Sequence, residues 1–397
     1  MRRGPRTARN TRRALRALGA ACSLALVFTT GAARATDPRI ALRLESAPAE
    51  SAAVTARVDA NGTNQTSALL PEHPSTLWQT RITPPLVGEL AVDADGRLLV
   101  AHASDRLTAL DSAGHAVWSV RTGAELALGP LPVAGGRSLL VTRDAHVVRV
   151  SAGGVLEGRE TLPWAAFEQS PLAIPTLDGG AIVAAGSTLA RIGPRGAGGY
   201  EARLPDPIRA VFEWQGATLA VGHAGTIFAR KAAGDPVRFG SFQTPVRAVA
   251  LVGQRLFALG RSELLTFDLV TKERRVAFGD PAADLRDLAT LAAGRLRLVA
   301  TGALLVDVDA SGHELGRLRL PIAESGGELA SIVTDRTGRT LLGTSGSMLL
   351  LLTPQGDSRA LPDSSCIDPM RPTPVRDTRF VVACRSGLLR AFSDRAR

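Results

Sequence analysis

Residues Asp95–Gly123 read DGRLLVAHASDRLTALDSAGHAVWSVRTG and hold one complete copy of a repeated unit. Turn residues separate three short runs: the apolar run Arg97–Ala101, the alternating run Arg106–Leu110, and Ala116–Arg121, which contains Trp118. Glycine adopts positive φ without steric cost, so glycine-containing turns between such runs favour antiparallel strands. A single sheet of this kind has two open edges and one small face. The unit therefore needs neighbouring copies to bury it.

Further copies of the unit follow one another to the C-terminus. The second strand of each copy has a recognisable start, which is arginine in six of the eight copies. Successive starts are 36 to 44 residues apart. The eight starts are Arg97, Arg137, Ala181, Ala217, Arg255, Arg295, Arg339 and Arg379. A period of about 40 residues with four short strands per copy predicts an all-β propeller of eight blades, or of seven if one weak copy is miscounted.

The two ends of the array indicate how the ring closes. The eighth copy stops after its third strand, while an orphan segment, Leu77–Arg81 (LWQTR), precedes the first copy. This segment matches Val117–Arg121 (VWSVR) in the placing of Trp and Arg. We expect the N-terminal strand to complete the last blade, because closure removes the exposed sheet edges. A chain that begins at Pro84 should then lose stability, and one that begins at Thr76 should not.

The first 35 residues have the plan of a secretory signal peptide. A basic start precedes an apolar run, Ala17–Phe28, and Ala33-Arg34-Ala35 marks a cleavage site after Ala35. The apolar run is shorter than the roughly 20 residues that span a bilayer, so no transmembrane segment is expected after cleavage. Thr11–Leu15 partly matches a twin-arginine signal, which leaves Sec and twin-arginine export both open. The predicted location is periplasmic or secreted.

The charge of the chain lies mostly in this leader. The formal net charge is +10, and residues 1–35 contain eight arginines and no acidic residue, so +2 remains after their removal. A nucleic-acid partner is therefore not predicted. Residues 36–75 are rich in Ala, Ser, Thr, Glu and Pro without a lasting period and are predicted to be a flexible linker. The propeller domain is assigned to residues 76–397.

Two cysteines remain in the exported chain, Cys366 and Cys384. In an oxidising compartment a pair 18 positions apart favours one disulfide bond. Two free thiols or a metal site are the alternatives, and neither cysteine has a histidine beside it.

Leu107–Gly123 (LTALDSAGHAVWSVRTG) resembles the repeat of pyrroloquinoline-quinone-like propellers of the WD40/quinoprotein-type superfamily. Val306–Leu318 (VDVDASGHELGRL) is a second copy with Gly316 in place of Trp118. The resemblance covers the chain from about Leu77 to the C-terminus and implies the propeller fold. The dehydrogenases of this family hold a quinone and a calcium ion in the central pocket, with adjacent cysteines, a tryptophan floor and a catalytic aspartate.

The residues that this chemistry needs are not gathered in this sequence. It has no adjacent cysteines, and its scattered acids, such as Asp93, Asp178, Asp307 and Asp335, fit turn residues that bond their own backbone. Calcium needs six to eight converging oxygens, which no acidic loop supplies. We therefore predict no catalytic residue, no cofactor and no metal site, with a quinoprotein dehydrogenase kept as the alternative function.

The remaining hypothesis is a monomeric, non-catalytic scaffold that binds a protein or another ligand on one face of the ring. The repeat is similar to that of the outer-membrane assembly scaffold of Gram-negative bacteria. Aromatic side chains dominate binding hot spots, and Trp164 and Phe167, in the loop that enters the third blade, are the predicted contacts with the partner. The six histidines fall in the linker or at strand ends and turns, where a structural role is expected.

Overall fold

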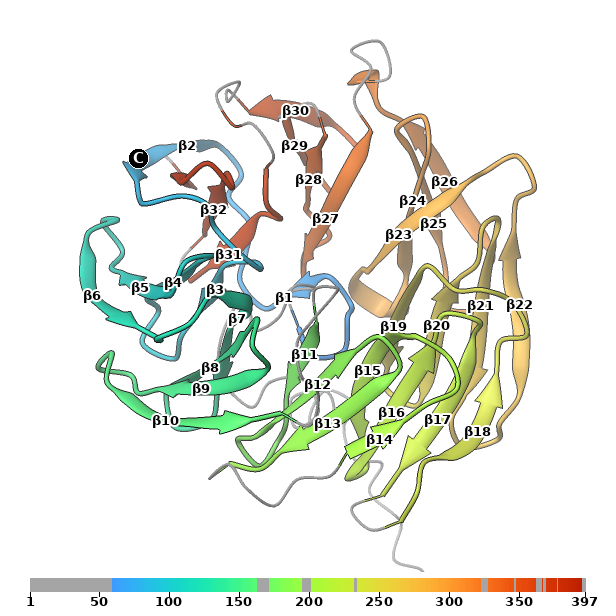
Figure 1. Ribbon diagram of the computed structural model, residues 1–397. Coiled ribbons are helices and arrows are strands. Elements are labelled where there is room, and N and C mark those ends of the chain that lie inside the picture. The colour runs from blue at the N-terminus through green and yellow to red at the C-terminus, as the bar shows by residue number, and fades with distance from the viewer. Residues whose placement is uncertain are drawn as a thin grey trace, which may run out of the picture. The chain divides into compact units, whose positions relative to one another are not determined.

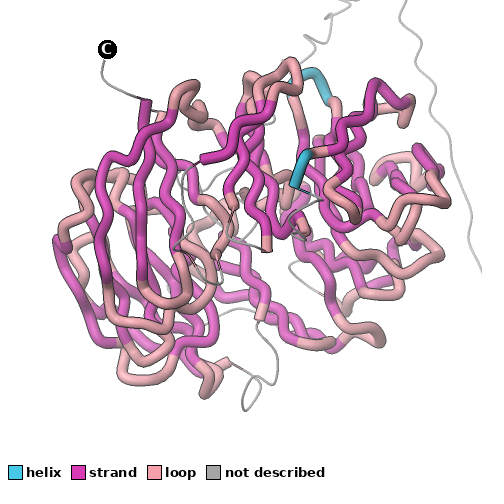
Figure 2. Tube along the Cα trace, turned by 90° about the horizontal axis from the view of Figure 1, so that it is seen from above, coloured by secondary structure: helices cyan, strands magenta, loops and turns pink. Residues whose placement is uncertain are grey.

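The computed structural model describes residues 59–162, 171–194, 201–231, 234–322, 328–345, 348–361, 366, 369–376 and 378–394. All of them belong to one compact unit, Pro38–Arg397. Within this unit, eight sheets stand around a common axis (Figure 1). Strands dominate the described chain and helix is almost absent (Figure 2), apart from short turns such as the 3-10 helix η1 (Ala292–Gly294). The predicted eight-bladed all-β propeller is confirmed.

Each four-stranded unit is a blade, numbered 1 to 8 along the chain. Blades 1 to 4 consist of β3 (Ala91–Val92), β4 (Leu98–His102), β5 (Arg106–Leu110) and β6 (Ala116–Arg121); β7 (Leu126–Val133), β8 (Arg137–Thr142), β9 (His146–Val150) and β10 (Leu156–Thr161); β11 (Leu172–Pro175), β12 (Ala181–Ala185), β13 (Thr188–Ile192) and β14 (Glu201–Arg203); and β15 (Ile208–Trp214), β16 (Ala217–Gly222), β17 (Thr226–Arg230) and β18 (Val237–Ser241).

Blades 5 to 8 continue the pattern. They consist of β19 (Ala248–Val252), β20 (Arg255–Leu259), β21 (Glu263–Asp268) and β22 (Arg274–Gly279); β23 (Leu285–Thr290), β24 (Leu296–Ala300), β25 (Leu304–Val308) and β26 (Glu314–Arg319); β27 (Leu329–Asp335), β28 (Thr340–Thr344), β29 (Leu349–Leu352) and β30 (Ser358–Leu361); and β31 (Thr373–Val375), β32 (Arg379–Ala383), β33 (Leu388–Asp394) and β2 (Pro74–Arg81). A short strand, β1 (Gln65–Thr66), adds to blade 7. All eight second strands begin within one residue of the predicted starts.

The ring closes as the ends of the sequence predict. Strand β2 pairs antiparallel with β33, from Pro74 opposite Asp394 to Arg81 opposite Leu388, and is the fourth strand of blade 8. The core cluster between blades 8 and 1 joins Val381 and Leu389 to Val92 and Val100. Because this interface has the same character as the others, the first and last blades pack as ordinary neighbours.

The hydrophobic core is divided among the gaps between blades. Each of eight buried clusters is shared by two adjacent sheets, and Val, Leu, Ile and Ala supply most of the side chains. Truncating one buried leucine in such a cluster to alanine costs about 2–5 kcal/mol in comparable cores. The stability of each blade therefore depends on both of its neighbours, as the repeat predicts.

The tryptophans of the repeat link neighbouring blades. Trp78 Nε1 donates to the carbonyl of Ser112 at 2.9 Å, and Trp118 Nε1 donates to that of Ala152 at 3.0 Å. Both acceptors lie in the turn between the third and fourth strands of the next blade. Gly154 has φ +80° there, and a Cβ on it would lie 2.6 Å from the Trp118 ring. The repeated Trp and Gly are thus two halves of one contact between blades.

The structure differs from the expected linker boundary near Ser75. Residues 59–73 are packed rather than extended into solvent: Asn64 and Leu70 are fully buried, and Gln65 and Thr66 pair with β27 in parallel. The Leu70 amide donates to Asp335 Oδ2 at 2.9 Å. This stretch forms its contacts through backbone groups and isolated side chains, so it lacks the period that marks a strand in the sequence.

The predicted disulfide is present. The sulfur atoms of Cys366 and Cys384 are 2.05 Å apart, and both cysteines are buried beside Leu388. The bond joins the connection that leads into β31 to the end of β32. It therefore fixes the entry to blade 8, the blade that closes the ring.

Candidate functional site

The first strand of each blade lines the central channel (Figure 1). The inner strands of blades 5 to 7 and those of blades 2 to 4 differ in what lies beside them. In blades 5, 6 and 7 the neighbour is the chain itself, residues 59–73, called here the N-terminal segment. The amides of Leu251, Thr290 and Thr334, one from each blade, donate to the carbonyls of Asn61, Thr63 and Asn64, all at 2.9 Å. The segment thus crosses three consecutive inner strands. We call blades 5 to 7 the docked half of the channel.

A polar cluster holds Asn64 of the N-terminal segment in place. Asn64 Nδ2 donates to the carbonyl of Leu288 at 2.6 Å, and its Oδ1 accepts from Arg371, which precedes β31. Arg371 also donates to the Ile332 carbonyl at 3.0 Å and lies 3.4 Å from Asp287 Oδ2. The side chains of Arg371 and Asp287 are only 16% and 19% exposed. The docked half is therefore filled and its polar groups are paired.

In three blades outside the docked half, proline occupies the position whose backbone amide, in the docked blades, donates to the N-terminal segment. In each blade a hairpin turn joins the inner strand to the second strand. The position in question is one residue before the last inner-strand residue that pairs across this turn. In blades 1 to 8 it is Val92, Pro132, Pro175, Glu213, Leu251, Thr290, Thr334 and Pro374. Proline has no amide hydrogen, and an unpaired buried N–H is costly. Blades 2 and 3 thus have no donor where the N-terminal segment would require one.

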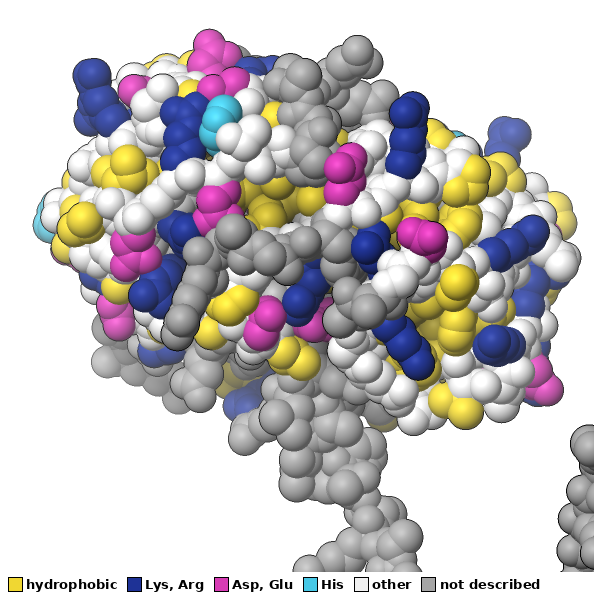
Figure 3. Space-filling model, turned by 60° about the horizontal axis from the view of Figure 1, so that its bottom comes forward, with side chains coloured by type: hydrophobic (Ala, Val, Ile, Leu, Met, Phe, Trp, Pro, Cys, Tyr) yellow, Lys and Arg dark blue, Asp and Glu magenta, His cyan; other side chains and the backbone are white. Residues whose placement is uncertain are grey.

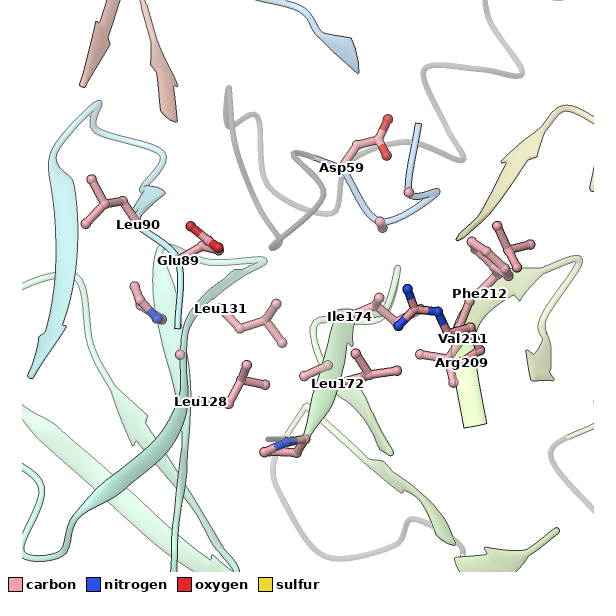
Figure 4. A pocket seen from close by; sticks show the side chains of 18 residues that line it. Asp59, Glu89, Leu90, Leu128, Leu131, Leu172, Ile174, Arg209, Val211 and Phe212 are labelled. Atoms are coloured by element: carbon pink, nitrogen blue, oxygen red, sulfur yellow. The ribbon is translucent and has the colours of Figure 1, made fainter. Parts of the chain in front are cut away.

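A pocket of about 120 Å³ occupies the channel beside blades 2 to 4. Figure 4 shows Leu128, Leu131, Leu172 and Ile174 on neighbouring inner strands, between Glu89 on one side and Arg209 on the other. The first residues of the N-terminal segment, among them Asp59, line its far wall. We call blades 2 to 4 the open half. Its walls are mainly apolar, the usual character of a site that takes an apolar group.

Arginines surround one carboxylate next to the pocket. Arg209, which lines the pocket, donates to the carbonyl of Arg247 at 2.5 Å. Arg247 in turn contacts Asp284 Oδ1 at 2.5 Å, Arg286 contacts Oδ2 at 2.7 Å, and Arg261 lies 3.7 Å from Oδ1. We call these four arginines and Asp284 the arginine cluster. It lies on the face of the ring where the inner strands begin.

The electrostatics of the cluster follow from this geometry. Desolvation raises the pKa of Asp284, but the hydrogen bond from Arg247 and the charges of Arg247, Arg286 and Arg261 outweigh it and lower the pKa below its usual range. Asp284 is therefore ionised at neutral pH. One carboxylate then faces three paired guanidinium groups, so the cluster keeps an excess of positive charge.

The candidate acids named from the sequence have structural partners. Asp93 Oδ1 accepts from the amides of Asp95 and Arg97, and Asp178 and Asp335 accept from amides of their own turns. These three turn assignments are confirmed. Asp307 was wrongly assigned to a turn: it lies in β25 and forms a two-bonded ion pair with Arg297, both contacts at 2.7 Å.

The histidines also have local contacts. His102 is buried, with Nδ1 2.7 Å from the Thr83 carbonyl and Nε2 2.9 Å from Thr108 Oγ1. His115 is exposed beside Asp111 in its turn. Within the described ranges, no three His, Cys, Asp or Glu side chains converge as metal ligands would. Trp164 and Phe167, the predicted partner contacts, lie outside the described residues.

On another view of the surface, hydrophobic side chains lie between scattered basic and acidic ones (Figure 3). The described part of the chain has no helix that is long and apolar enough to cross a membrane.

Fold and site together define an eight-bladed β-propeller whose channel is filled by its own N-terminal segment at blades 5 to 7 and carries an apolar pocket at blades 2 to 4. The family can be named more closely. Residues 65–277, more than half of the chain, match the family model described as "Outer membrane protein assembly factor BamB", and the chain belongs to that family. The predicted resemblance to quinone-type propellers is confirmed. No curated protein matches the chain by sequence.

Solved structures agree on the fold. BamB from Moraxella catarrhalis is 16% identical, with a TM-score of 0.63 over 81% of this chain and 99% of that one. Virginiamycin B lyase from Staphylococcus aureus is 12% identical, with a TM-score of 0.52 over 81% and 99%. YCF48 bound to D1 peptide is 12% identical, with a TM-score of 0.50 over 65% and 89%. Identities this low bear on the fold alone.

Proposed function

We propose that this protein is an exported, non-catalytic scaffold of the cell envelope that binds a protein partner at the open half of its channel. The observation that carries the proposal is the pocket of the open half, apolar inside and bordered by Arg209, in a chain of the BamB family. The family is described as an outer membrane protein assembly factor, which supports a role in assembly. The leader sequence supports export to the periplasm.

The pocket suits binding better than chemistry. Its charged lining residues are already engaged: Asp59 accepts from the amide of Thr63 at 2.9 Å, and Glu89 accepts from the amide of Arg371 at 3.0 Å. A catalytic acid or base needs its proton within reach of a substrate, whereas these two carboxylates accept hydrogen bonds from backbone amides. A recessed apolar wall is the kind of surface that anchors a side chain of a partner.

Photo-crosslinking in the native envelope tests this function. A photoreactive amino acid in place of Leu172, on the pocket wall, should give one defined protein adduct, and the same residue in place of Val276, on the outer strand of blade 5, should not. The adduct partner, identified and purified, should bind the wild-type protein and bind a folded Leu172→Asp variant more weakly. Equal binding by the two forms would refute the pocket as the site.

The quinoprotein alternative is tested on the same purified protein. Pyrroloquinoline quinone and calcium are added, and absorbance after gel filtration reports bound quinone. Stoichiometric quinone that depends on calcium would replace the scaffold proposal with the enzyme.

A further inference from the structure

One residue, Arg209, connects the arginine cluster to the pocket. Arg209 belongs to both: it lines the pocket, and its guanidinium donates to the backbone of Arg247. Arg247 also donates to the carbonyl of Leu285, which carries the contact on to blade 6. A ligand anchored in the pocket therefore has guanidinium groups beside it, on the side of blades 4 to 6.

The exposed members of the cluster are available to a partner. The side chains of Arg261 and Arg286 are 82% and 48% exposed, while the Asp284 they share is 24% exposed. Asp280, on the same connection, is engaged by Arg317 at 2.5 Å. Guanidinium groups bind carboxylates and phosphates through paired N–H donors, and carboxylates are the anionic groups that an unmodified protein segment carries.

We infer that the partner presents an acidic segment with an apolar side chain: the apolar side chain enters the open half, and flanking carboxylates bind the arginine cluster. This rests on the proposed function and names the chemistry of the partner. The pocket limits the anchor, because cavities of roughly 150 Å³ accept a group the size of benzene. At about 120 Å³, this pocket has room for a single aliphatic side chain.

The missing backbone donors of blades 2 and 3 sharpen the inference. Pro132 and Pro175 offer no amide to an added strand at the level where the docked half donates. At this position, blades 2 and 3 can hold a partner only through side chains and carbonyl groups, which gives apolar contact and charge a larger share of recognition. A partner bound mainly through its backbone would not discriminate by charge, and this makes the two modes separable.

The experiment uses the mature protein and three fluorescein-labelled peptides, read by fluorescence anisotropy. The first alternates leucine with aspartate, the second has lysine in place of aspartate, and the third has serine in place of leucine. The first should bind, and each of the other two should bind at least about tenfold more weakly. Binding of the first should weaken as salt is raised from 50 to about 300 mM, because exposed charges are screened.

Variants locate the binding. Arg261→Glu combined with Arg286→Glu should weaken binding of the acidic peptide about tenfold or more. Arg274→Glu combined with Arg275→Glu reverses the charge of two exposed arginines on β22 and serves as the matched control, with a change below about twofold. Thermal melting confirms that each variant is folded.

The outcomes separate the inference from the proposed function. If the acidic and basic peptides bind equally, or if the control variant weakens binding as much as the cluster variant, the inference is overturned. If Leu172→Asp abolishes binding of the native partner while the cluster variant leaves it unchanged, the proposed function stands and the acidic segment is rejected. Loss in both the cluster and the pocket variants supports both.

Discussion

The docked and open halves of the channel are built from the same repeat and differ in what their inner strands offer. In the docked half, Leu251, Thr290 and Thr334 donate backbone amides to the N-terminal segment. In the open half, Pro132 and Pro175 remove that donor, and leucines line the space. In blades 2 and 3, proline thus removes the amide through which blades 5 to 7 bind the N-terminal segment, whereas blade 4 keeps an amide at Glu213.

Removing the closing strand should have the largest effect. A chain that begins at Pro84 loses β2 and the N-terminal segment, which exposes the edge of β33 and the polar groups of the docked half. We expect aggregation or loss of the cooperative melting transition. A chain that begins at Asp59 should have the same melting temperature as the mature protein. A chain that begins at Thr76 should have a lower melting temperature, contrary to the expectation from sequence. Equal melting of all three would contradict the closure.

Exchanging the deciding residues between the halves comes next. Thr334→Pro removes the amide that donates to Asn64, and we expect a loss of about 3 kcal/mol or more in the free energy of unfolding. Pro175→Thr adds an amide to the buried end of β11 and should cost less, roughly 1–2 kcal/mol, because it breaks no existing hydrogen bond. Urea denaturation measures both. The reverse order of the two losses would show that the halves do not differ in this way.

Two channel arginines allow a third comparison. Arg371→Met removes the guanidinium that contacts Asp287 and donates to Asn64 Oδ1, and should cost about 2–4 kcal/mol of unfolding free energy. Arg209→Met, at the pocket, should cost below about 1 kcal/mol, because its bond to the Arg247 carbonyl is exposed. Similar losses of unfolding free energy in the two variants would show that Arg209 stabilises the fold as much as Arg371 does.

The contact between tryptophan and glycine should give a smaller loss. Gly154→Ala places a Cβ against the Trp118 ring at a positive φ, and we expect a loss of about 1–3 kcal/mol in the free energy of unfolding. Gly216→Ala is the control, since it has φ +71° but nothing within 4 Å of the added Cβ. If both variants lose the same amount, backbone strain alone explains the effect and the ring contact contributes nothing.

The smallest predicted effect depends on pH. Burial lowers the pKa of His102, which a hydrogen bond to the Thr83 carbonyl opposes and the charge of Arg106 assists. The unfolded chain then binds a proton more readily than the folded one, so stability falls as pH drops below about 6.5 and is constant in this respect above it. Melting temperatures of wild type and His102→Gln between pH 5 and pH 8 measure this, and the variant should have the flatter profile.

The sequence predicts the blades well because each hairpin has a local sequence pattern, a glycine turn such as Asp93–Arg97 followed by an apolar second strand. Closure follows because Trp78 and Trp118 occupy the same place in their strands. The channel was not predicted. The N-terminal segment docks through backbone carbonyls, which leave no side-chain pattern in the sequence. The prolines of blades 2, 3 and 8 are recognised as equivalent only when the inner strands are aligned in space.

The arginine cluster was missed for a different reason. Its members come from the beginnings of the inner strands of blades 4, 5 and 6 and from the turn between β20 and β21, and arginine is common along the whole chain, so neither spacing nor composition marks it. Only the convergence of Arg247 and Arg286 on Asp284 distinguishes these side chains from the others.

Amide hydrogen exchange, measured on the mature protein alone and with its purified partner, tests the central claim most directly. We predict that residues 59–73 and the inner strands β19, β23 and β27 are protected in both states, and that partner binding adds protection only in β7, β11, β15 and around Arg247 and Asp284. Added protection confined to the outer strands, or exposure of residues 59–73 on binding, would contradict the division of the channel into a docked and an open half.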